Sequence, residues 1–449
     1  MSRIDVTCEM SRIDVTCGHG LEKKEGMPGG KSILWRRGGD HVNGGGRSLS
    51  VILMASVLLI GPRKSSLLSF PFGTNDQPIL QGMLDSKAHY NRIGDHLDRW
   101  DMHVFSCDLY RIITPYIPLA GCACVACFSV SPSSGKLTHL RSQSAMGKST
   151  CYLELDTSLE HLLFVNYWDS VVGTMPLTPS GLLEPVTETL QPERPIVALN
   201  IMDHLANRQS ESHAHAIVLD PYFGKVAFIP DLGLDIIQQH HYDAETGVLT
   251  PSATLGCGPD ELKPHGPRYI AFHPSINAAY VVNELSSTVS VYEFNSAEAR
   301  GSKAGDARPA LSFVQSVSTI PSAFPRKLNT CGRICVDPTG SFVLVSNRGH
   351  NSIAVFAITK STRYGEADYL RIVNYCHSKG ATPRHFQFDP SGEFLLVANQ
   401  DTDSVTIFRF DNVTGQLSYT GDLHGVPSPN FVCVFQPHRN FRTSNQAKL

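Results

Sequence analysis

The chain has 449 residues, and its 38 lysine and arginine residues nearly balance 41 aspartate and glutamate residues, for a formal net charge of −3. This balance excludes the basic surface typical of nucleic-acid-binding proteins, so we expect no nucleic-acid partner. Twelve cysteines include the close group Cys122, Cys124 and Cys127, but no His or Cys group of zinc spacing follows it. We therefore expect neither a metal nor a cofactor. We expect the cysteines to be buried free thiols, which favours a reducing, cytoplasmic location.

The N-terminal segment differs from the rest of the chain. Met1 to Cys8 reads MSRIDVTC, and Met10 to Cys17 repeats these eight residues. A Gly-rich stretch (Gly38 to Gly46) precedes an apolar run from Leu49 to Gly61, whose 13 residues are too few to span a bilayer. The run also begins far into the chain and lacks a clear cleavage site, unlike a signal peptide. We expect residues 1–66 to be a poorly ordered leader, or the product of a faulty translation start, and we expect no membrane partner.

Residues 67–127 show no clear strand pattern, whereas the segment after them begins to show one. Phe128 to Leu140 (FSVSPSSGKLTHL) resembles the outer end of a β-sheet followed by its turn. Alternating apolar and polar residues around a Pro, Ser and Gly cluster are typical of a hairpin.

Five copies of a strand, a tight turn and a second strand then follow. The residues that open these turns stand 64, 53, 64 and 52 positions apart and are Thr157, Pro221, Pro274, Pro338 and Pro390. In the third copy, Tyr269 to Phe272 precedes the turn, while Ala279 to Asn283 and Thr288 to Phe294 follow it. These segments are short and rich in β-branched and aromatic residues, as strands are. A period of roughly 50 residues built from short strands predicts a β-propeller, in which neighbouring blades complete one another's core.

The sequence therefore predicts an all-β, seven-bladed β-propeller with a degenerate first blade. Besides the five copies and the Phe128 hairpin, Pro429 to Phe435 (PNFVCVF) resembles an inner strand of one more blade. We place the degenerate first-blade region at residues 67–127, the propeller at 128–436 and a C-terminal tail at 437–449. An N-terminal strand normally closes the last blade, so the atypical leader leaves ring closure open.

Two columns of variable residues recur at fixed distances from each turn. Six positions before the turn-opening residues stand Cys151, His215, Arg268, Gly332 and Arg384. Ten positions after them stand Tyr167, Asp231, Glu284, Arg348 and Gln400. The two offsets are symmetric about the turn, so an antiparallel hairpin places both columns side by side at its open end. The apolar pattern is kept in every copy and indicates a common scaffold. The residues at these two positions differ from copy to copy, which indicates that they form a functional site.

Several long segments carry a family resemblance. They are HAHAIVLDP from His213, IPDLGLD from Ile229, GPRYIAFHP from Gly266, VVNELSSTVSVYEF from Val281, SNRGHNSIAVF from Ser346, ATPRHFQFDPSGEFLLVANQDTDSV from Ala381 and VPSPNFVCVF from Val426. These segments resemble the seven-bladed lactonase family, which includes bacterial-type 6-phosphogluconolactonase and fungal carboxy-cis,cis-muconate cyclase. The resemblance extends from Phe128 to Phe435.

The resemblance implies a site at one end of the central channel, where a His, two Arg and a Glu act on an anionic lactone. By motif these are His215, Arg268, Glu284 and Arg348, and all four fall in the two columns. Ester hydrolysis needs a base for water and a donor for the developing oxyanion. His215 is expected to titrate near neutrality and to be the base, and Glu284 to orient Arg268 or move a proton.

The remaining candidates complete a substrate-binding set. Arginine guanidinium groups bind phosphate and carboxylate bidentately, so we assign Arg268, Arg348 and Arg384 to substrate binding, together with Asp231 and Gln400. The chain has no G-x-S-x-G elbow, so covalent serine catalysis has no support. Asn166, Asn283, Asn347 and Asn399 recur at one offset and are interpreted as structural hydrogen bonders.

Three functions stay open on the sequence alone. The first is hydrolysis of 6-phosphogluconolactone to 6-phosphogluconate in the pentose phosphate pathway. The second is a lactonising isomerase of the muconate cyclase type, and the third is a non-catalytic propeller that serves as a binding module.

Arg333 stands where the family usually has an acidic residue, which favours either tighter anion binding or a changed ligand. Structural alternatives also stay open: a strand-start role for His215, and a salt bridge of Arg268 with Glu284 that only pins a hairpin. The oligomeric state is not indicated.

Overall fold

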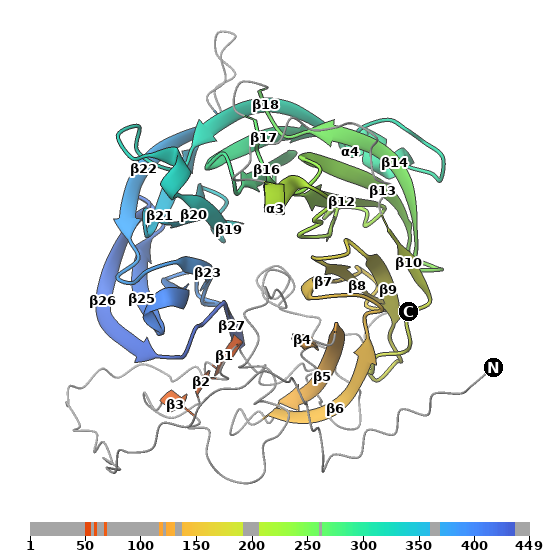
Figure 1. The fold of residues 1–449 in the computed structure, drawn as a ribbon, viewed down its shortest axis with the longest axis horizontal. Coiled ribbons are helices and arrows are strands. Elements are labelled where there is room, and N and C mark those ends of the chain that lie inside the picture. Colours follow the sequence, from red (N-terminus) through yellow and green to blue (C-terminus); the bar gives the residue numbers. More distant parts are fainter. Residues whose placement is uncertain are drawn as a thin grey trace, which may run out of the picture.

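The structure is a computed structural model, which describes residues 123–130, 137–191, 206–259, 263–359 and 369–435 and four short upstream strands. The upstream strands are β1 (Ser50–Met54), β2 (Leu58–Ile60), β3 (Leu67–Ser69) and β4 (Tyr116–Leu119). The duplicated octapeptide, the Gly-rich stretch and the tail at 437–449 lie outside the described residues. Figure 1 shows the sheets following one another around a ring, with the inner strands nearest its centre.

Five four-stranded antiparallel sheets form most of the described ring. The first comprises β7 (Thr150–Leu155), β8 (His161–Asn166), β9 (Val172–Pro176) and β10 (Glu188–Leu190). The second comprises β11 (Val218–Leu219), β12 (Val226–Asp231), β13 (Ile236–Asp243) and β14 (Val248–Gly256). The third comprises β15 (Pro267–Phe272), β16 (Ala278–Asn283), β17 (Thr288–Phe294) and β18 (Leu311–Ser318). The fourth comprises β19 (Thr330–Val336), β20 (Phe342–Arg348), β21 (Ser352–Ile358) and β22 (Leu370–His377). The fifth comprises β23 (Pro383–Phe388), β24 (Phe394–Asn399), β25 (Ser404–Asp411) and β26 (Gln416–Gly425). The five predicted copies are confirmed as these blades.

Two smaller sheets lie between the fifth and first blades in Figure 1. One consists of β4, β5 (Cys124–Val130) and β6 (Leu137–Ser144), so the predicted hairpin after Phe128 is present. The expected boundary between residues 127 and 128 falls inside β5. The other pairs β27 (Phe431–Phe435) with β1, with Ser50 opposite Phe435. A short segment of the expected leader thus pairs with the last strand of the propeller.

Side chains at the turns explain why each hairpin is so tight. An Asp directly precedes the turn-opening residue in four copies, namely Asp156, Asp220, Asp337 and Asp389. Asp337 Oδ1 accepts hydrogen bonds from the backbone nitrogens of Ser341 at 2.7 Å and Phe342 at 2.6 Å. In the third copy His273 takes this place, and its Nδ1 accepts from the backbone nitrogens at Ser275 and Ile276. Such side-chain acceptors favour turns over continued strand.

The recurring asparagines lie at the opposite ends of the hairpins and are buried. Asn283 Nδ2 donates to Ser290 Oγ at 2.8 Å, and Asn347 Nδ2 donates to the carbonyl of Thr319 at 2.7 Å. Asn283 therefore joins β16 to β17 of its own blade, whereas Asn347 joins β20 to the connection that follows β18 of the preceding blade. Their predicted structural role is confirmed.

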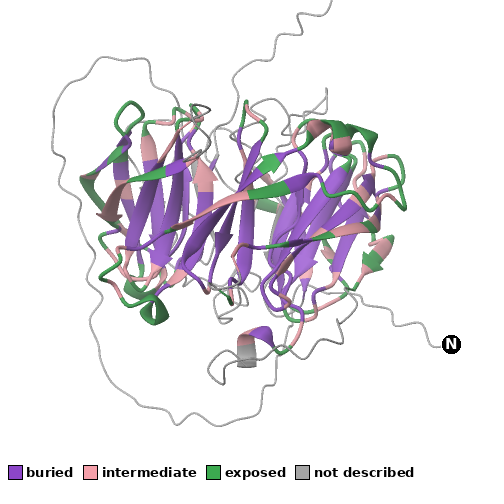
Figure 2. Cartoon of the chain, turned by 90° about the horizontal axis from the view of Figure 1, so that it is seen from above, coloured by how far each residue is buried: buried purple, intermediate pink, exposed green. Residues whose placement is uncertain are grey.

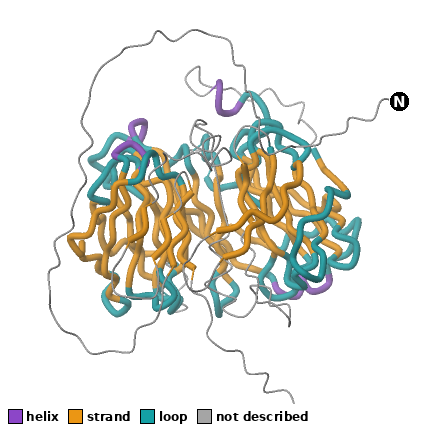
Figure 3. Tube along the Cα trace, turned by 90° about the horizontal axis from the view of Figure 1, so that it is seen from below, coloured by secondary structure: helices purple, strands orange, loops and turns teal. Residues whose placement is uncertain are grey.

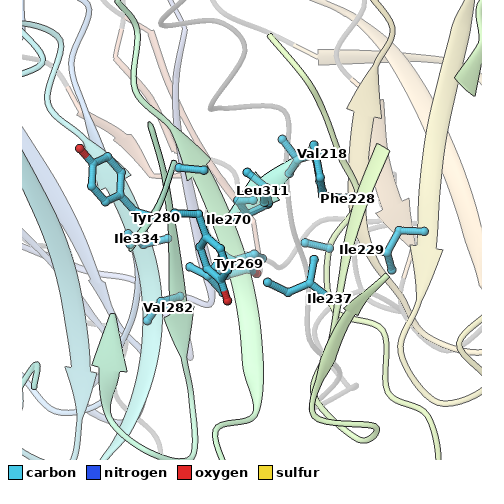
Figure 4. Packing of buried hydrophobic residues seen from close by; sticks show 14 of the residues in the cluster. Val218, Phe228, Ile229, Ile237, Tyr269, Ile270, Tyr280, Val282, Leu311 and Ile334 are labelled. Carbon is cyan, nitrogen blue, oxygen red and sulfur yellow. The ribbon is translucent and has the colours of Figure 1, made fainter. Parts of the chain in front are cut away.

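Apolar contacts between neighbouring sheets form the core. Figure 4 shows side chains of the second, third and fourth blades packing together, among them Phe228, Ile270 and Ile334. Figure 2 shows the same pattern for the whole ring, since burial is concentrated in the strands and exposure in the loops. Each fully buried side chain of this kind contributes about 1.5–3 kcal/mol relative to exposure. Packing between blades therefore supplies a rigid frame for the strand ends.

The described helices are short and lie in the connections. They are α3 (Ala206–Gln209), α4 (Ser296–Gly301) and the 3-10 turns η3 (Arg326–Leu328) and η4 (Gln400–Thr402). α3 lies beyond the ends of the strands on one side of the ring (Figures 2 and 3). None of the helices in the described part of the chain is long and apolar enough to cross a membrane.

Candidate active site

β-Bulges at the open ends of the hairpins place the first column of predicted residues. In the third blade Pro267 pairs with Asn283, and the register shifts before Tyr269, so Arg268 is the extra residue of the bulge. The same shift occurs at Cys151, across Gly332 and at Arg384 in their blades. A bulge turns its extra side chain away from the ladder and is common beside active sites. Because the extra residue of each bulge is not paired in the sheet, its type can differ between blades while the strands around it keep their apolar pattern.

Glu284 is the centre of an ion-pair cluster at this end of the ring. Its Oε2 lies 2.9 Å from Arg268 Nε and 2.8 Å from Arg348 Nη2. Its Oε1 lies 2.5 Å from Arg208 Nη2. Arg268 comes from the same blade as Glu284, Arg348 from the next blade and Arg208 from α3. One carboxylate therefore joins three guanidinium groups from three parts of the chain.

The two arginines from the blades are also held by backbone carbonyl groups. Arg268 Nη1 donates to the carbonyl of Gly332 at 2.8 Å, and Arg348 Nη2 donates to the carbonyl of Cys331 at 2.6 Å. A Cβ atom on Gly332 would lie only 2.8 Å from the carbonyl oxygen of Arg384. Glycine is needed at this column position because β19 and β23 approach so closely there.

The charges of the cluster set the protonation state of Glu284. Burial raises the pKa of its carboxyl, but Arg348, Arg208 and Arg268 outweigh burial and hold the pKa well below its usual range. Burial lowers the pKa of Arg348, and Glu284 opposes that shift. Glu284 is therefore ionised at neutral pH, and the cluster keeps two more positive than negative charges.

His215 lies next to this cluster in an aromatic surrounding. Its ring makes edge contacts with Tyr269 at 5.3 Å and Tyr167 at 5.2 Å between centroids. The Arg268 guanidinium lies over the same Tyr269 ring, 4.3 Å from its centroid. Burial lowers the pKa of His215 well below its usual value, and Arg268 lowers it further, while Glu284 opposes them. The expectation that His215 titrates near neutrality is wrong, because its imidazole is buried beside positive charge and stays neutral.

Arg384 and Gln400 face each other in the fifth blade, as the two offsets predict. Arg384 Nη1 donates to Gln400 Oε1 at 3.3 Å. The Arg384 side chain is buried, and its Nη2 has no hydrogen-bond partner among the described residues. Burial lowers the pKa of Arg384 to about 10, so its guanidinium is charged at neutral pH.

Asp231 is not joined to the Glu284 cluster. Its carboxylate accepts hydrogen bonds within its own blade from Ser212 Oγ at 2.5 Å, the backbone nitrogen of His213 at 2.9 Å and Gln238 Nε2 at 3.1 Å. These bonds hold the segment that leads into His215. The structure thus brings together His215, Arg268, Glu284 and Arg348, while Asp231 supports the approach to them.

Cys151, the column residue of the first blade, is a protonated thiol. Burial raises the pKa of this thiol, and its Sγ donates to the carbonyl of His215 at 3.5 Å. Among the described residues, no group of three or more His, Cys, Asp and Glu side chains is arranged to hold a metal ion.

Comparison with known proteins decides the family. Residues 121–434 match the family described as "Lactonase, 7-bladed beta-propeller". The chain belongs to this family. A curated 6-phosphogluconolactonase of Bacillus subtilis is 35% identical over 312 residues, which cover 69% of this chain and 79% of the relative. A 6-phosphogluconolactonase of Formosa agariphila is 28% identical over 316 residues, which cover 69% of this chain and 80% of the relative.

Solved structures support the lactonase fold. A putative 6-phosphogluconolactonase from Bacteroides fragilis superposes with a TM-score of 0.57 at 24% identity, covering 72% of this chain and 83% of that one. A periplasmic gluconolactonase from Pseudomonas aeruginosa superposes with a TM-score of 0.60 at 22% identity, covering 87% of this chain and 98% of that one. The predicted β-propeller is thereby confirmed.

Two arginines at the candidate active site were not among the predicted site residues. Arg208 lies in a segment without repeat character, between the first and second copies of the repeat. Arg333 was noted only as a departure from the family. It is buried, and its Cζ lies 5.5 Å from the centroid of the Tyr269 ring. Both add positive charge to the end of the ring that holds Glu284.

Proposed function

We propose that the protein is a lactone hydrolase that converts 6-phosphoglucono-1,5-lactone and water to 6-phosphogluconate, a step of the pentose phosphate pathway. The observation that carries this proposal is the excess of guanidinium groups around Glu284, where three arginines surround one carboxylate. Such an arrangement attracts a multiply charged anion. Membership of the lactonase family and the named activities of the curated relatives support the same reaction class.

We assign His215 as the base that activates water. Its lowered pKa keeps the ring neutral at physiological pH, so a nitrogen lone pair is present to take the proton. As the proton moves, positive charge develops on the imidazole. Glu284 is ionised and favours the charged form of His215, which partly offsets the opposing effects of burial and Arg268. Glu284 therefore supports the base and at the same time holds Arg268 and Arg348 in place.

We assign Arg384 as the donor for the lactone oxygen. Its buried Nη2 has no hydrogen-bond partner among the described residues, and Gln400 orients the guanidinium through Nη1. A preorganised, buried donor of this kind stabilises the oxyanion that forms when water attacks the lactone carbonyl. Asp231 contributes indirectly by holding the segment before His215.

We place the protein in the cytoplasm. Eight cysteines of the described residues are free thiols, and most of them are buried. This pattern is typical of proteins that fold in a reducing compartment.

The test is a comparison of substrates with freshly prepared 6-phosphogluconolactone, glucono-1,5-lactone and carboxymuconolactone. We expect hydrolysis of the phosphorylated lactone above its spontaneous rate, and His215→Ala should lower kcat roughly a hundredfold or more if His215 is the base. Turnover of carboxymuconolactone alone would favour an isomerase of the muconate cyclase type. No turnover of any of the three would favour a binding module and contradict the proposal.

A further inference from the structure

Arg208 differs from the other arginines of the cluster in its origin. It lies in α3, which is not part of any blade and is located beyond the strand ends (Figures 2 and 3). α3 lies in the connection between β10 of the first blade and β11 of the second. Arg208 therefore comes from a connection between blades and not from a strand of the repeat.

Arg208 also differs in exposure. Its side chain is 32% exposed, whereas those of Arg268 and Arg348 are 2% and 10% exposed. The two buried arginines divide their donors between Glu284 and backbone carbonyl groups. A ligand that approaches Glu284 from the end of the ring therefore meets the guanidinium of Arg208 first.

The contacts of Arg208 connect it, through Tyr167, to the surroundings of the candidate base. It pairs with Glu284 Oε1 at 2.5 Å and also hydrogen-bonds the side chain of Tyr167. Tyr167 in turn stacks on His213, with 4.8 Å between ring centroids, and touches the edge of His215. The guanidinium is thus held by two partners, while 32% of the Arg208 side chain as a whole is exposed.

We propose that Arg208 binds the anionic substituent of the substrate, the phosphate group of a phosphorylated sugar lactone, and so determines the preference for charged over neutral lactones. This inference rests on the proposed function for the identity of the substrate. Glu284 does not oppose the binding of a dianion, because Arg208, Arg268 and Arg348 together outweigh its charge. A guanidinium that is already oriented by Glu284 loses less rotational freedom when it binds phosphate.

The experiment measures binding rather than turnover, so that it does not depend on the catalytic assignment. Isothermal titration with 6-phosphogluconate and with gluconate is carried out on the wild-type protein and on Arg208→Met, Arg208→Lys and Arg308→Met. Arg308 is a matched control, because it is an exposed arginine that pairs with Glu298 and Asp306 away from the cluster. Melting temperatures establish that each variant is folded.

We expect Arg208→Met to weaken 6-phosphogluconate binding about tenfold or more, equal to about 1.4 kcal/mol. For the same variant, gluconate binding should change less than about twofold. Arg208→Lys should have an intermediate effect, since lysine keeps the charge but not the planar fork of donors. Arg308→Met should bind both ligands as the wild type does. An equal loss for both ligands, or no loss for 6-phosphogluconate, overturns the inference. Specific binding without lactone hydrolysis by the wild type would instead contradict the proposed function and leave the inference supported.

Discussion

Glu284 and Arg348 belong to neighbouring blades, and Glu284 Oε2 lies 2.8 Å from Arg348 Nη2. The backbone joins the blades at the same place, because the backbone nitrogen of Cys331 donates to the carbonyl of Glu284 at 3.1 Å. Arg348 completes the connection by donating to the carbonyl of Cys331. The joint between the third and fourth blades and the candidate active site are therefore built from the same groups, and changes there are expected to affect stability and activity together.

Glu284→Gln should destabilise the fold. The substitution keeps the shape of the side chain but leaves buried Arg268 and Arg348 without their carboxylate. Removing one partner of a buried ion pair typically costs about 3–5 kcal/mol. Urea unfolding measures the loss, and the control is Glu393→Gln, whose exposed pair with Arg409 is expected to contribute about 0–1 kcal/mol. Equal stabilities for the two variants would contradict the structural role of Glu284.

The pH dependence of stability should have a component from each buried titratable group of the site. The pKa of Glu284 is lower in the folded state, so its contribution is present above its unfolded pKa and is lost as the pH falls through the folded pKa. The pKa of His215 is also lower in the folded state, so below about pH 6.5 the unfolded chain binds a proton that the folded chain does not. Stability should therefore fall as the pH drops below about 6.5. His215→Asn should make that decline less steep without abolishing it, because burial also lowers the pKa of His240, to about 4. The free energy of unfolding is measured between neutral and mildly acidic pH, and an unchanged profile would contradict the buried, neutral state of His215.

The same lowered pKa has a kinetic consequence. If His215 is the base, kcat/KM should stay flat from about pH 8 to below about pH 6.5, the ordinary pKa of histidine. An acidic limb centred near that ordinary value would show that the base is solvated or is another residue. The measurement needs correction for spontaneous lactone hydrolysis at each pH.

Gly332→Ala should disturb the joint between β19 and β23. The new Cβ would lie 2.6 Å from Ser346 Oγ and 2.8 Å from the carbonyl oxygen of Arg384, so one strand has to move. Overpacking of this kind costs about 1–3 kcal/mol, and it displaces the carbonyl that receives Arg268. Gly425→Ala is the matched control, since nothing lies within 4 Å of its Cβ position. A decrease in melting temperature and in kcat is expected for the first variant alone.

Arg384→Met should lower kcat more than it raises KM. A preorganised donor to an oxyanion typically contributes about a hundredfold to a thousandfold in kcat. Arg409→Met, at an exposed arginine on the outer part of the same blade, serves as the control for lost charge. A rise in KM with unchanged kcat would reassign Arg384 to binding of the ground state.

The hairpins, the blades and most of the site were predictable because they are encoded locally and repeated. Pairing of Arg268 with Glu284, and of Arg384 with Gln400, followed from symmetry about a turn. Arg208 was not predictable, since it reaches Glu284 from a connection between blades, outside the repeated pattern and 76 residues away. The protonation state of His215 was not predictable either, because it depends on burial and on charges contributed by other blades.

The pairing of β1 with β27 places Ser50 opposite Phe435, so most of the chain lies between these two strands. Contacts between such distant residues form late in folding, because a long loop has to be closed before they are gained. During synthesis, β1 leaves the ribosome long before its partner exists. The first segment of the ring to be made therefore has to remain unpaired until the last blade appears, which makes Ser50–Met54 a natural target for chaperones and an edge at risk of pairing with another chain.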